Sequence, residues 1–134
     1  MSIEQIAKPD DRDEWLTVRH SRFNASQAAA LLDRHPFTSI QDVITEKLAP
    51  GPIQQAENSA MVRGRLAEPF VADWYAIDAG VDLYEPTVMF ANGVCLATLD
   101  RLPTTADGTA IEIKTTAKRL DGYPERYWTD QTQM

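Results

Sequence analysis

The sequence has few of the residues that form covalent cross-links or histidine and thiolate metal sites. Its 134 residues include one cysteine, Cys95, and two histidines, His20 and His35. A single cysteine excludes an intramolecular disulfide and a cysteine-rich zinc site. Two isolated histidines do not support a histidine metal cluster or a Ser-His-Asp arrangement. Cys95 lies in an apolar segment and is predicted to be a buried thiol.

Long apolar runs are also missing. No stretch approaches the roughly 20 apolar residues needed to cross a bilayer, and residues 1–5 have neither a basic head nor an apolar signal core. The content of 43% hydrophobic and 25% charged residues is ordinary for a globular chain. We therefore expect one intracellular domain over residues 1–134, without a membrane partner. The net charge of -7 disfavours a nucleic-acid partner without excluding one, because bound cations neutralise carboxylates at a metal site.

Helical patterns occupy most of the chain before Gly80, which is expected to stop the last of them. Asn24 or Ser26 is the expected cap of the second helix. Thr38 and Gln41 have the spacing of a capping box at the start of the third. The expected helices cover residues 12–19, 24–32, 38–48 and 58–79.

The longest predicted helix carries an apolar stripe at helical spacing, which predicts that it lies across the sheet. Pro69 is predicted to kink the helix or restart it just after Glu68. Glu68 beside such a break could reach a bound metal directly or through water, and a solvated helix glutamate is the equal alternative. The stripe consists of Leu66, Phe70, Trp74 and Ile77.

Three strands are expected after this helix, over residues 81–90, 94–99 and 109–115. Pro86 suggests an edge or a bulge in the first. Asn92-Gly93 and Asp107-Gly108 supply the turns of a three-strand meander. A further helical segment begins at Pro124.

The stretch from Thr109 to Thr115 holds the strongest candidate site. Strict alternation places Glu112 and Lys114 on one side of an extended segment, and the predicted hairpin brings Asp100 beside them. Two converging carboxylates repel unless a hard cation with oxygen ligands relieves them, so we expect Mg²⁺ here, with the Ile113 carbonyl as a further ligand. The alternative is a solvated strand face with a surface salt bridge.

A second candidate lies near the N-terminus. Trp15 and Arg19 stand one turn apart on the same helix face. A helix N-terminus carrying Ser26 and facing Arg19 could hold a phosphate. Ordinary helix capping is the alternative, and these residues alone favour it.

Six short motifs follow one another in an order that resembles one protein family. A Trp-x3-Arg pair, an Asn-Ala-Ser turn, a Met-x2-Gly-x3-Glu helix, an Ala-x2-Asp strand end, a Glu-x-Lys strand and a Gln-x-Gln helix span residues 15–133. The pattern is similar to that of the YqaJ-like viral recombinases and phage lambda exonuclease, a branch of the PD-(D/E)xK nucleases. The matching segments are Trp15 with Arg19, Asn24 to Ser26, Met61 to Glu68, Ala97 to Asp100, Glu112 to Thr116, and Gln131 to Gln133.

The resemblance implies an α/β fold with a mixed sheet. The expected core is restriction-endonuclease-like, with a helix, a three-strand meander and a further helix, preceded by N-terminal helices. Asp100, Glu112 and the Ile113 carbonyl would bind Mg²⁺, for which Mn²⁺ can substitute. Glu68 would complete the acidic cluster, and Lys114 would act on the attacking water.

Three further residues match family positions with roles of their own. Gln131 would support the catalytic site from the last helix, while Arg19 and Ser26 would contact the terminal 5′ phosphate of DNA. The resemblance implies a Mg²⁺-dependent exonuclease of phage or prophage recombination that acts on duplex DNA ends in the cytoplasm of a bacterial host. It also implies a single-strand annealing protein as partner and a ring-shaped homo-oligomer.

Two departures from the family pattern support other interpretations. The family usually has Pro before the metal-binding Asp and Gly after it, whereas Leu99 and Arg101 flank Asp100 here. Arg101 could pair with a carboxylate or touch DNA. The family also continues beyond the glutamine pair, so the domain is expected to be truncated at its C-terminus. The alternatives are a catalytically inactive module that binds DNA ends or a recombination partner, and a plain interaction domain whose carboxylates are surface charge.

Overall fold

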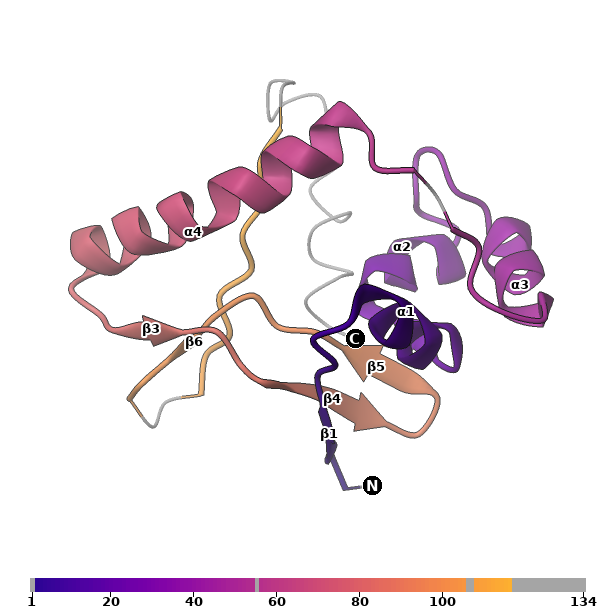
Figure 1. Cartoon of the computed structure of the whole chain (residues 1–134), viewed down its shortest axis with the longest axis horizontal. Coiled ribbons are helices and arrows are strands. Elements are labelled where there is room, and N and C mark those ends of the chain that lie inside the picture. Colours follow the sequence, from indigo (N-terminus) through magenta and orange to yellow (C-terminus); the bar gives the residue numbers. More distant parts are fainter. Residues whose placement is uncertain (1, 55, 106–107, 117–134) are drawn as a thin grey trace. The chain divides into compact units, whose positions relative to one another are not determined.

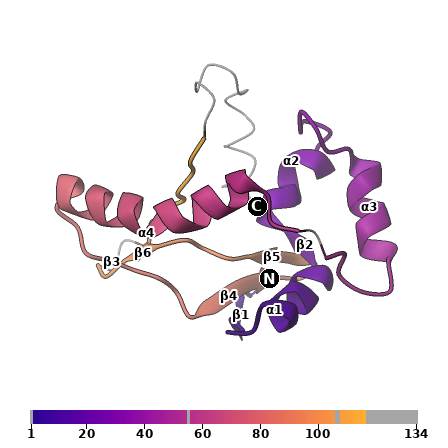
Figure 2. The same cartoon turned by 45° about the horizontal axis from the view of Figure 1, so that its top comes forward.

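The computed structural model describes residues 2–54, 56–105 and 108–116 of the chain. They form two compact units, whose described residues are 2–54 with 87–98, and 56–86 with 99–105 and 108–116. Figure 1 labels elements of both units, and β2 is labelled in Figure 2. Their mixed α and β content confirms the expected fold class. The expectation of a single domain over the whole chain stays a prediction.

The first unit is built on a four-stranded sheet with the strand order β1-β4-β5-β2. β4 is antiparallel to β1 and β5, and β2 runs parallel to β5. The predicted Asn92-Gly93 turn joins β4 to β5, and Gly93 has a φ of 59°, which favours glycine. The first strand was missing from the sequence prediction. The elements are β1 (Glu4–Ala7), α1 (Arg12–His20), β2 (Phe23–Asn24), the 3-10 helix η1 (Ala25–Gln27), α2 (Ala28–Leu31), α3 (Ile40–Leu48), β4 (Val88–Asn92) and β5 (Cys95–Ala97).

The core of this unit lies where α1 packs against the sheet (Figure 2). Trp15 and Val18 of α1 are partly buried against the apolar side chains of β4 and β5. Cys95 is of intermediate exposure, so the prediction of a buried thiol is wrong. The buried residues of this core are Met89, Ala91 and Leu96.

The capping box of α3 lies one residue later than predicted. The Ser39 hydroxyl accepts the Asp42 N–H at 3.1 Å, and the Asp42 carboxylate accepts the Ser39 N–H at 2.8 Å. Hydrogen bonds from Ser39 to this carboxylate, first from its backbone and then from its side chain, lower the pKa of Asp42. The predicted pair of Thr38 and Gln41 is wrong, because the neighbouring hydroxyl residue and an acidic residue satisfy the same spacing.

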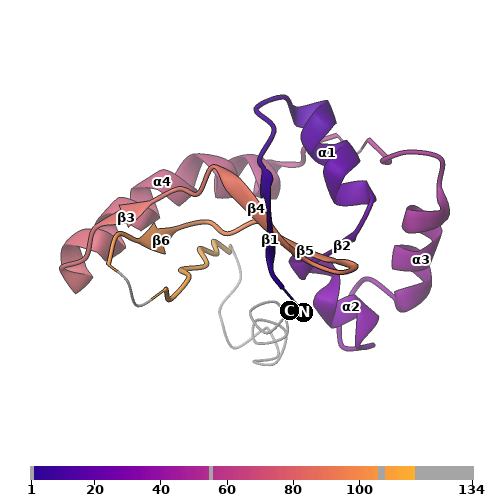
Figure 3. The ribbon, with the colours of Figure 1, turned by 90° about the horizontal axis from the view of Figure 1, so that it is seen from below.

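The second unit combines the long helix α4 (Ser59–Ala79) with a two-stranded sheet of β3 (Leu83–Tyr84) and β6 (Leu102–Pro103), which lie alongside it in Figure 3. The Asn58 side chain caps the N-terminus of α4. Gly80 ends the helix, as predicted, and has a φ of 65°. The helix continues through Pro69, so the predicted restart after Glu68 is wrong. Within the described residues, no helix has the length and apolar character to span a membrane.

The predicted apolar stripe of α4 does not face a sheet in the structure. Its four side chains are between 65% and 80% exposed. The less exposed positions of the helix lie elsewhere, and they include Gly64, Glu68 and Ala72 at intervals of four residues, with Val71 beside them. The first three share one face because side chains four positions apart lie above one another. The packed face of α4 is therefore the face of Gly64, Glu68 and Ala72, and the predicted orientation is wrong.

The three-strand meander is also corrected. The predicted strand over 81–90 is split around Pro86 into β3 and β4, and residues 109–115 form no strand. Their only described ladder contact is an antiparallel bridge between Ile111 and Arg101. Gly108 has a φ of 68°, consistent with a turn there, while Asp107 and the helix expected from Pro124 lie outside the described residues.

Ser39→Ala should destabilise the first unit by about 1 kcal/mol, because the N-terminus of α3 loses its side-chain acceptor. Thr38→Ala, one residue earlier, is the matched control and should change the free energy of unfolding by no more than about 0.5 kcal/mol. Urea unfolding at pH 7 measures both. Equal losses in the two variants would contradict the placement of the cap.

Candidate functional site

A backbone bridge in the second unit sets the register of the candidate site. The Arg101 N–H donates to the Ile111 carbonyl at 3.2 Å, and the Ile111 N–H donates to the Arg101 carbonyl at 2.9 Å. In antiparallel pairing, residues on either side of a bridged pair also stand opposite each other. The bridge therefore places Asp100 opposite Glu112, as the sequence predicted from a longer hairpin.

The side chains around this bridge converge. An Asp100 carboxylate oxygen accepts the Ile113 N–H at 2.7 Å, and the Lys114 ammonium contacts the Glu112 carboxylate at 2.5 Å. Ile111 and Ile113 are partly buried, whereas Glu112 and Lys114 are more exposed, so the predicted alternation is confirmed without a regular strand.

The electrostatics of Glu112 reflect the proximity of the two carboxylates. Burial is the main cause that raises the pKa of Glu112, the Lys114 ammonium opposes the rise, and the neighbouring Asp100 carboxyl adds to it through charge and hydrogen bonding. A cation between these oxygens would remove the repulsion. The prediction that Asp100 and Glu112 lie together is consistent with this geometry.

A polar cavity of about 250 Å³ opens beside the pair. Its lining combines the small residues of the packed face of α4 with the segment around Lys114. Gly64 lies beside Thr115, and a Cβ at this position would make an ordinary van der Waals contact of 3.6 Å with the Thr115 hydroxyl oxygen. The available donors are hard oxygens, which suit Mg²⁺ or Mn²⁺. The lining residues are Ala60, Gly64, Glu68, Asp100, Ile113, Lys114 and Thr115.

Glu68 reaches the cavity wall but is already paired. Its carboxylate accepts a hydrogen bond from the Arg101 guanidinium at 2.7 Å, and Arg101 itself is 9% exposed. The sequence left open whether Arg101 pairs with a carboxylate or touches DNA, and in the structure it pairs with a carboxylate. Within residues 2–54, 56–105 and 108–116, no three acidic, histidine or cysteine residues are grouped closely enough to hold a metal. The acidic side chains that the structure brings together are thus those of Asp100 and Glu112. Gln131 lies outside the described residues.

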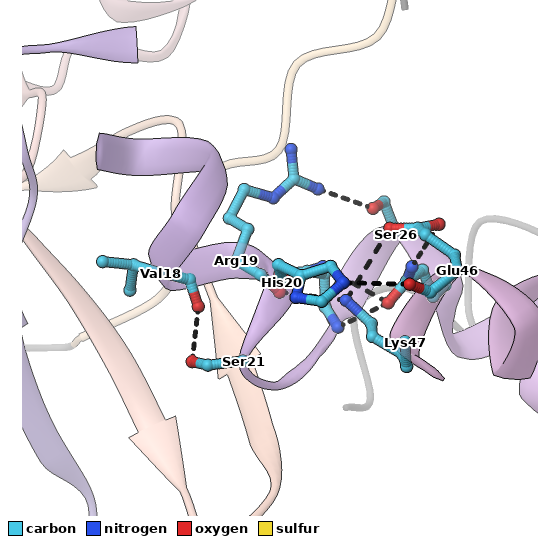
Figure 4. A network of polar contacts seen from close by, with 9 residues as sticks. Val18, Arg19, His20, Ser21, Ser26, Glu46 and Lys47 are labelled. Carbon is cyan, nitrogen blue, oxygen red and sulfur yellow. Dashed lines mark hydrogen bonds and ion pairs between the residues drawn. The ribbon is translucent and has the colours of Figure 1, made fainter. Parts of the chain in front are cut away.

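The second candidate, in the first unit, forms around Arg19 (Figure 4). Its guanidinium donates to the Ser26 hydroxyl at 3.0 Å and lies over the Trp15 ring at 4.5 Å, so the predicted juxtapositions are present. Burial is the main cause that lowers the pKa of Arg19, while the Glu46 carboxylate raises it and Arg12 lowers it further. The guanidinium stays charged, because the ordinary pKa of arginine is far above neutrality.

A network that the sequence did not reveal supports this arginine. Lys47 donates to the Arg19 carbonyl at 2.9 Å, and the Asn24 amide donates to the same carbonyl at 3.2 Å. Gln27 links Asn24 to α3 by accepting the Asn24 N–H at 3.0 Å and donating to the Glu46 carboxylate at 3.2 Å. The capping-box spacing from Asn24 to Gln27 was the one available signal, and it gave no indication of the contacts from α3.

The model of the YqaJ-like viral recombinase domain matches residues 14–132, which is most of the chain. The protein belongs to the YqaJ-like viral recombinase family. Two solved structures are similar to this YqaJ-like chain: LHK-Exo in complex with dAMP, and the alkaline exonuclease LHK-Exo from Laribacter hongkongensis. Each has a TM-score of 0.69 and 25% identity, and they cover 90% and 88% of this chain respectively.

The YqaJ-like chain spans 65% and 63% of the lengths of those two structures. No curated protein matches it significantly. The family assignment and the fold of the chain are therefore established by these matches, and the expected family and fold class are confirmed.

Asp100→Ala should lower the free energy of unfolding by about 1.5 kcal/mol without added metal, because the partly buried Ile113 N–H loses a charged acceptor. Asp100→Asn is the matched control: it removes the same charge but keeps an acceptor oxygen, so its loss should be smaller. Urea unfolding in EDTA measures both variants. Identical losses would show that the hydrogen bond does not contribute to stability.

Proposed function

We propose that this chain is a Mg²⁺-dependent deoxyribonuclease of phage or prophage recombination that hydrolyses phosphodiester bonds at duplex DNA ends. The observation that carries the proposal is the placement of Asp100 opposite Glu112 by the Arg101–Ile111 bridge, beside a polar cavity that Asp100 and Lys114 line. The family match and the similarity to an alkaline exonuclease give the reaction class. A single-strand annealing partner, a ring-shaped homo-oligomer and a cytoplasmic location are further parts of this proposal.

The chain supplies a hard-oxygen ligand set for the metal. Asp100, Glu112 and the Ile113 carbonyl would hold Mg²⁺, or Mn²⁺ in its place. Such a cation, when bound, lowers the pKa of a coordinated water and offsets charge on the phosphate. The Asp100 carboxylate is oriented by the Ile113 N–H, so this ligand is fixed before any cation arrives.

In this proposal, Lys114 acts on the attacking water. Its ammonium contacts Glu112 and lines the cavity, which keeps the positive charge next to the reacting phosphate. There it would orient the water and stabilise the charge that develops on the phosphate oxygens. Glu68 would add a third acidic side chain at the wall of the cavity, and Gln131 would support the site, as the family resemblance implies.

The Arg19 site would bind the terminal 5′ phosphate. A guanidinium that stacks on Trp15 and donates to the Ser26 hydroxyl is held in one orientation, and the group that accepts this hydrogen bond is neutral. Guanidinium and hydroxyl groups are suitable donors to phosphate oxygens. This supports recognition of a phosphorylated end rather than of a base sequence.

The alternative is a catalytically inactive module that binds DNA ends or a recombination partner. The Arg101–Glu68 ion pair favours it, because it engages one of the three acidic side chains proposed for the site. End binding without cleavage in Mg²⁺ or Mn²⁺ would select this alternative. Absence of both end binding and metal binding would leave the interaction-domain interpretation.

The purified protein should degrade linear duplex DNA when Mg²⁺ is present. Glu112→Ala and Lys114→Ala should each reduce the rate by about 100-fold or more, because they remove a metal ligand and a charge acting in the transition state. Asp73→Ala, which removes an exposed carboxylate of α4, is the matched control and should retain the rate. Release of acid-soluble nucleotides is the measurement. Undiminished rates in the first two variants would remove the assignment of the site.

Arg19→Ala should reduce the preference for 5′-phosphorylated over 5′-hydroxyl duplex ends by about tenfold, because it removes a charge-assisted donor to the phosphate. Arg12→Ala, on the same helix, changes the local charge equally and should preserve the preference. Competition binding with the two kinds of end measures the ratio in each variant. A ratio that falls equally in both variants would indicate general electrostatic attraction instead.

A further inference from the structure

Arg101 is the most enclosed charged side chain among the described residues of the second unit. One guanidinium nitrogen, Nη1, donates both to the Glu68 carboxylate at 2.7 Å and to the Asp100 carbonyl at 2.6 Å, and the Glu85 carboxylate lies at 4.0 Å. The Arg101 backbone is fixed independently by the bridge to Ile111. The Arg101 side chain therefore links α4 to the backbone of Asp100.

These contacts determine what Glu68 can do. A carboxylate that accepts a charge-assisted hydrogen bond from a buried guanidinium is oriented toward that partner, and separating the two would leave a buried charge uncompensated. Asp100 differs, since its carboxylate accepts a neutral backbone N–H instead of a guanidinium. The two acidic side chains on the cavity wall are consequently unequal as ligands.

On the basis of the proposed function, we propose that Arg101 is a positioning residue. It keeps Glu68 from coordinating the divalent cation directly, so that Asp100 and Glu112 are the carboxylates that bind the ion. Glu68 then lies at the cavity wall, paired with Arg101, without ligating the ion. The other partners of Arg101, the Asp100 carbonyl and Glu85, keep the guanidinium in place when the Glu68 charge is removed. Arg101 thus fixes which carboxylates bind the metal.

Isothermal titration calorimetry with MnCl₂ alone tests the assignment without a nuclease assay. Glu68→Gln should change the Mn²⁺ dissociation constant by less than about twofold in the otherwise unchanged chain, since this carboxylate is held by Arg101. Asp100→Asn should weaken binding by more than about tenfold. In the Arg101→Ala background the released carboxylate becomes available, and Glu68→Gln should then weaken binding by about tenfold.

Arg101→Lys is the conservative variant, and in its background Glu68→Gln should again have only a small effect. A tenfold weakening by Glu68→Gln in the unchanged chain would overturn the inference. Equal effects of Glu68→Gln in the unchanged chain and in the Arg101→Ala background would overturn it too. If Arg101→Ala does not fold, the comparison of Glu68→Gln with Asp100→Asn in the unchanged chain still decides. A lack of Mn²⁺ binding by the unchanged chain would instead contradict the proposed metal site itself.

Discussion

The backbone bridge between Arg101 and Ile111 is the constraint on which the candidate site depends. Its two hydrogen bonds set the register of two segments that otherwise form no regular ladder, and this register brings Asp100 opposite Glu112. If the register shifted by one residue, the side chains of the shifted segment would point to the opposite side. The hydrogen bond from Ile113 to the Asp100 carboxylate reinforces the same register through a side chain.

Ion pairs determine how this concentration of carboxylates is tolerated. Lys114 lies against Glu112, and Arg101 lies against Glu68 with little exposure to solvent. Lys114 and Arg101 each lie within two residues of an acidic residue of the site in the sequence. The register that brings the carboxylates together therefore also brings these two positive charges close to them. The carboxyl of Glu112 nevertheless has a raised pKa, since burial and Asp100 outweigh its ammonium partner. Charge at the site is therefore only partly compensated by the chain itself.

The sequence predicted the proximity of Asp100 and Glu112 better than the secondary structure around them. Alternation in Ile111 to Lys114 is a local property, so it survives although the segment forms no strand. The start of α4 near Asn58 and its stop at Gly80 also depend on local residues, and the expected range of 58–79 agrees with the helix to within one residue. The orientation of α4 was not predicted correctly, because an apolar stripe indicates only that some surface can cover it, and here the stripe is exposed while Gly64, Glu68 and Ala72 pack inward. The partner of Arg101 stayed undecided because it lies 33 positions away in the chain.

The two candidate sites have one feature in common. In each, an arginine is held in place by contacts other than the hydrogen bond that its guanidinium donates to a side chain. Arg19 stacks on Trp15, and its backbone carbonyl is held by Lys47 and Asn24. Arg101 is held through its backbone by Ile111. Fixing a guanidinium in this way lowers the entropy lost when it binds an anion, and thus favours binding in one geometry. The two arginines differ in what that geometry serves: Arg101 already meets a carboxylate, whereas Arg19 meets a neutral hydroxyl, which leaves its charge suited to an anionic ligand such as phosphate.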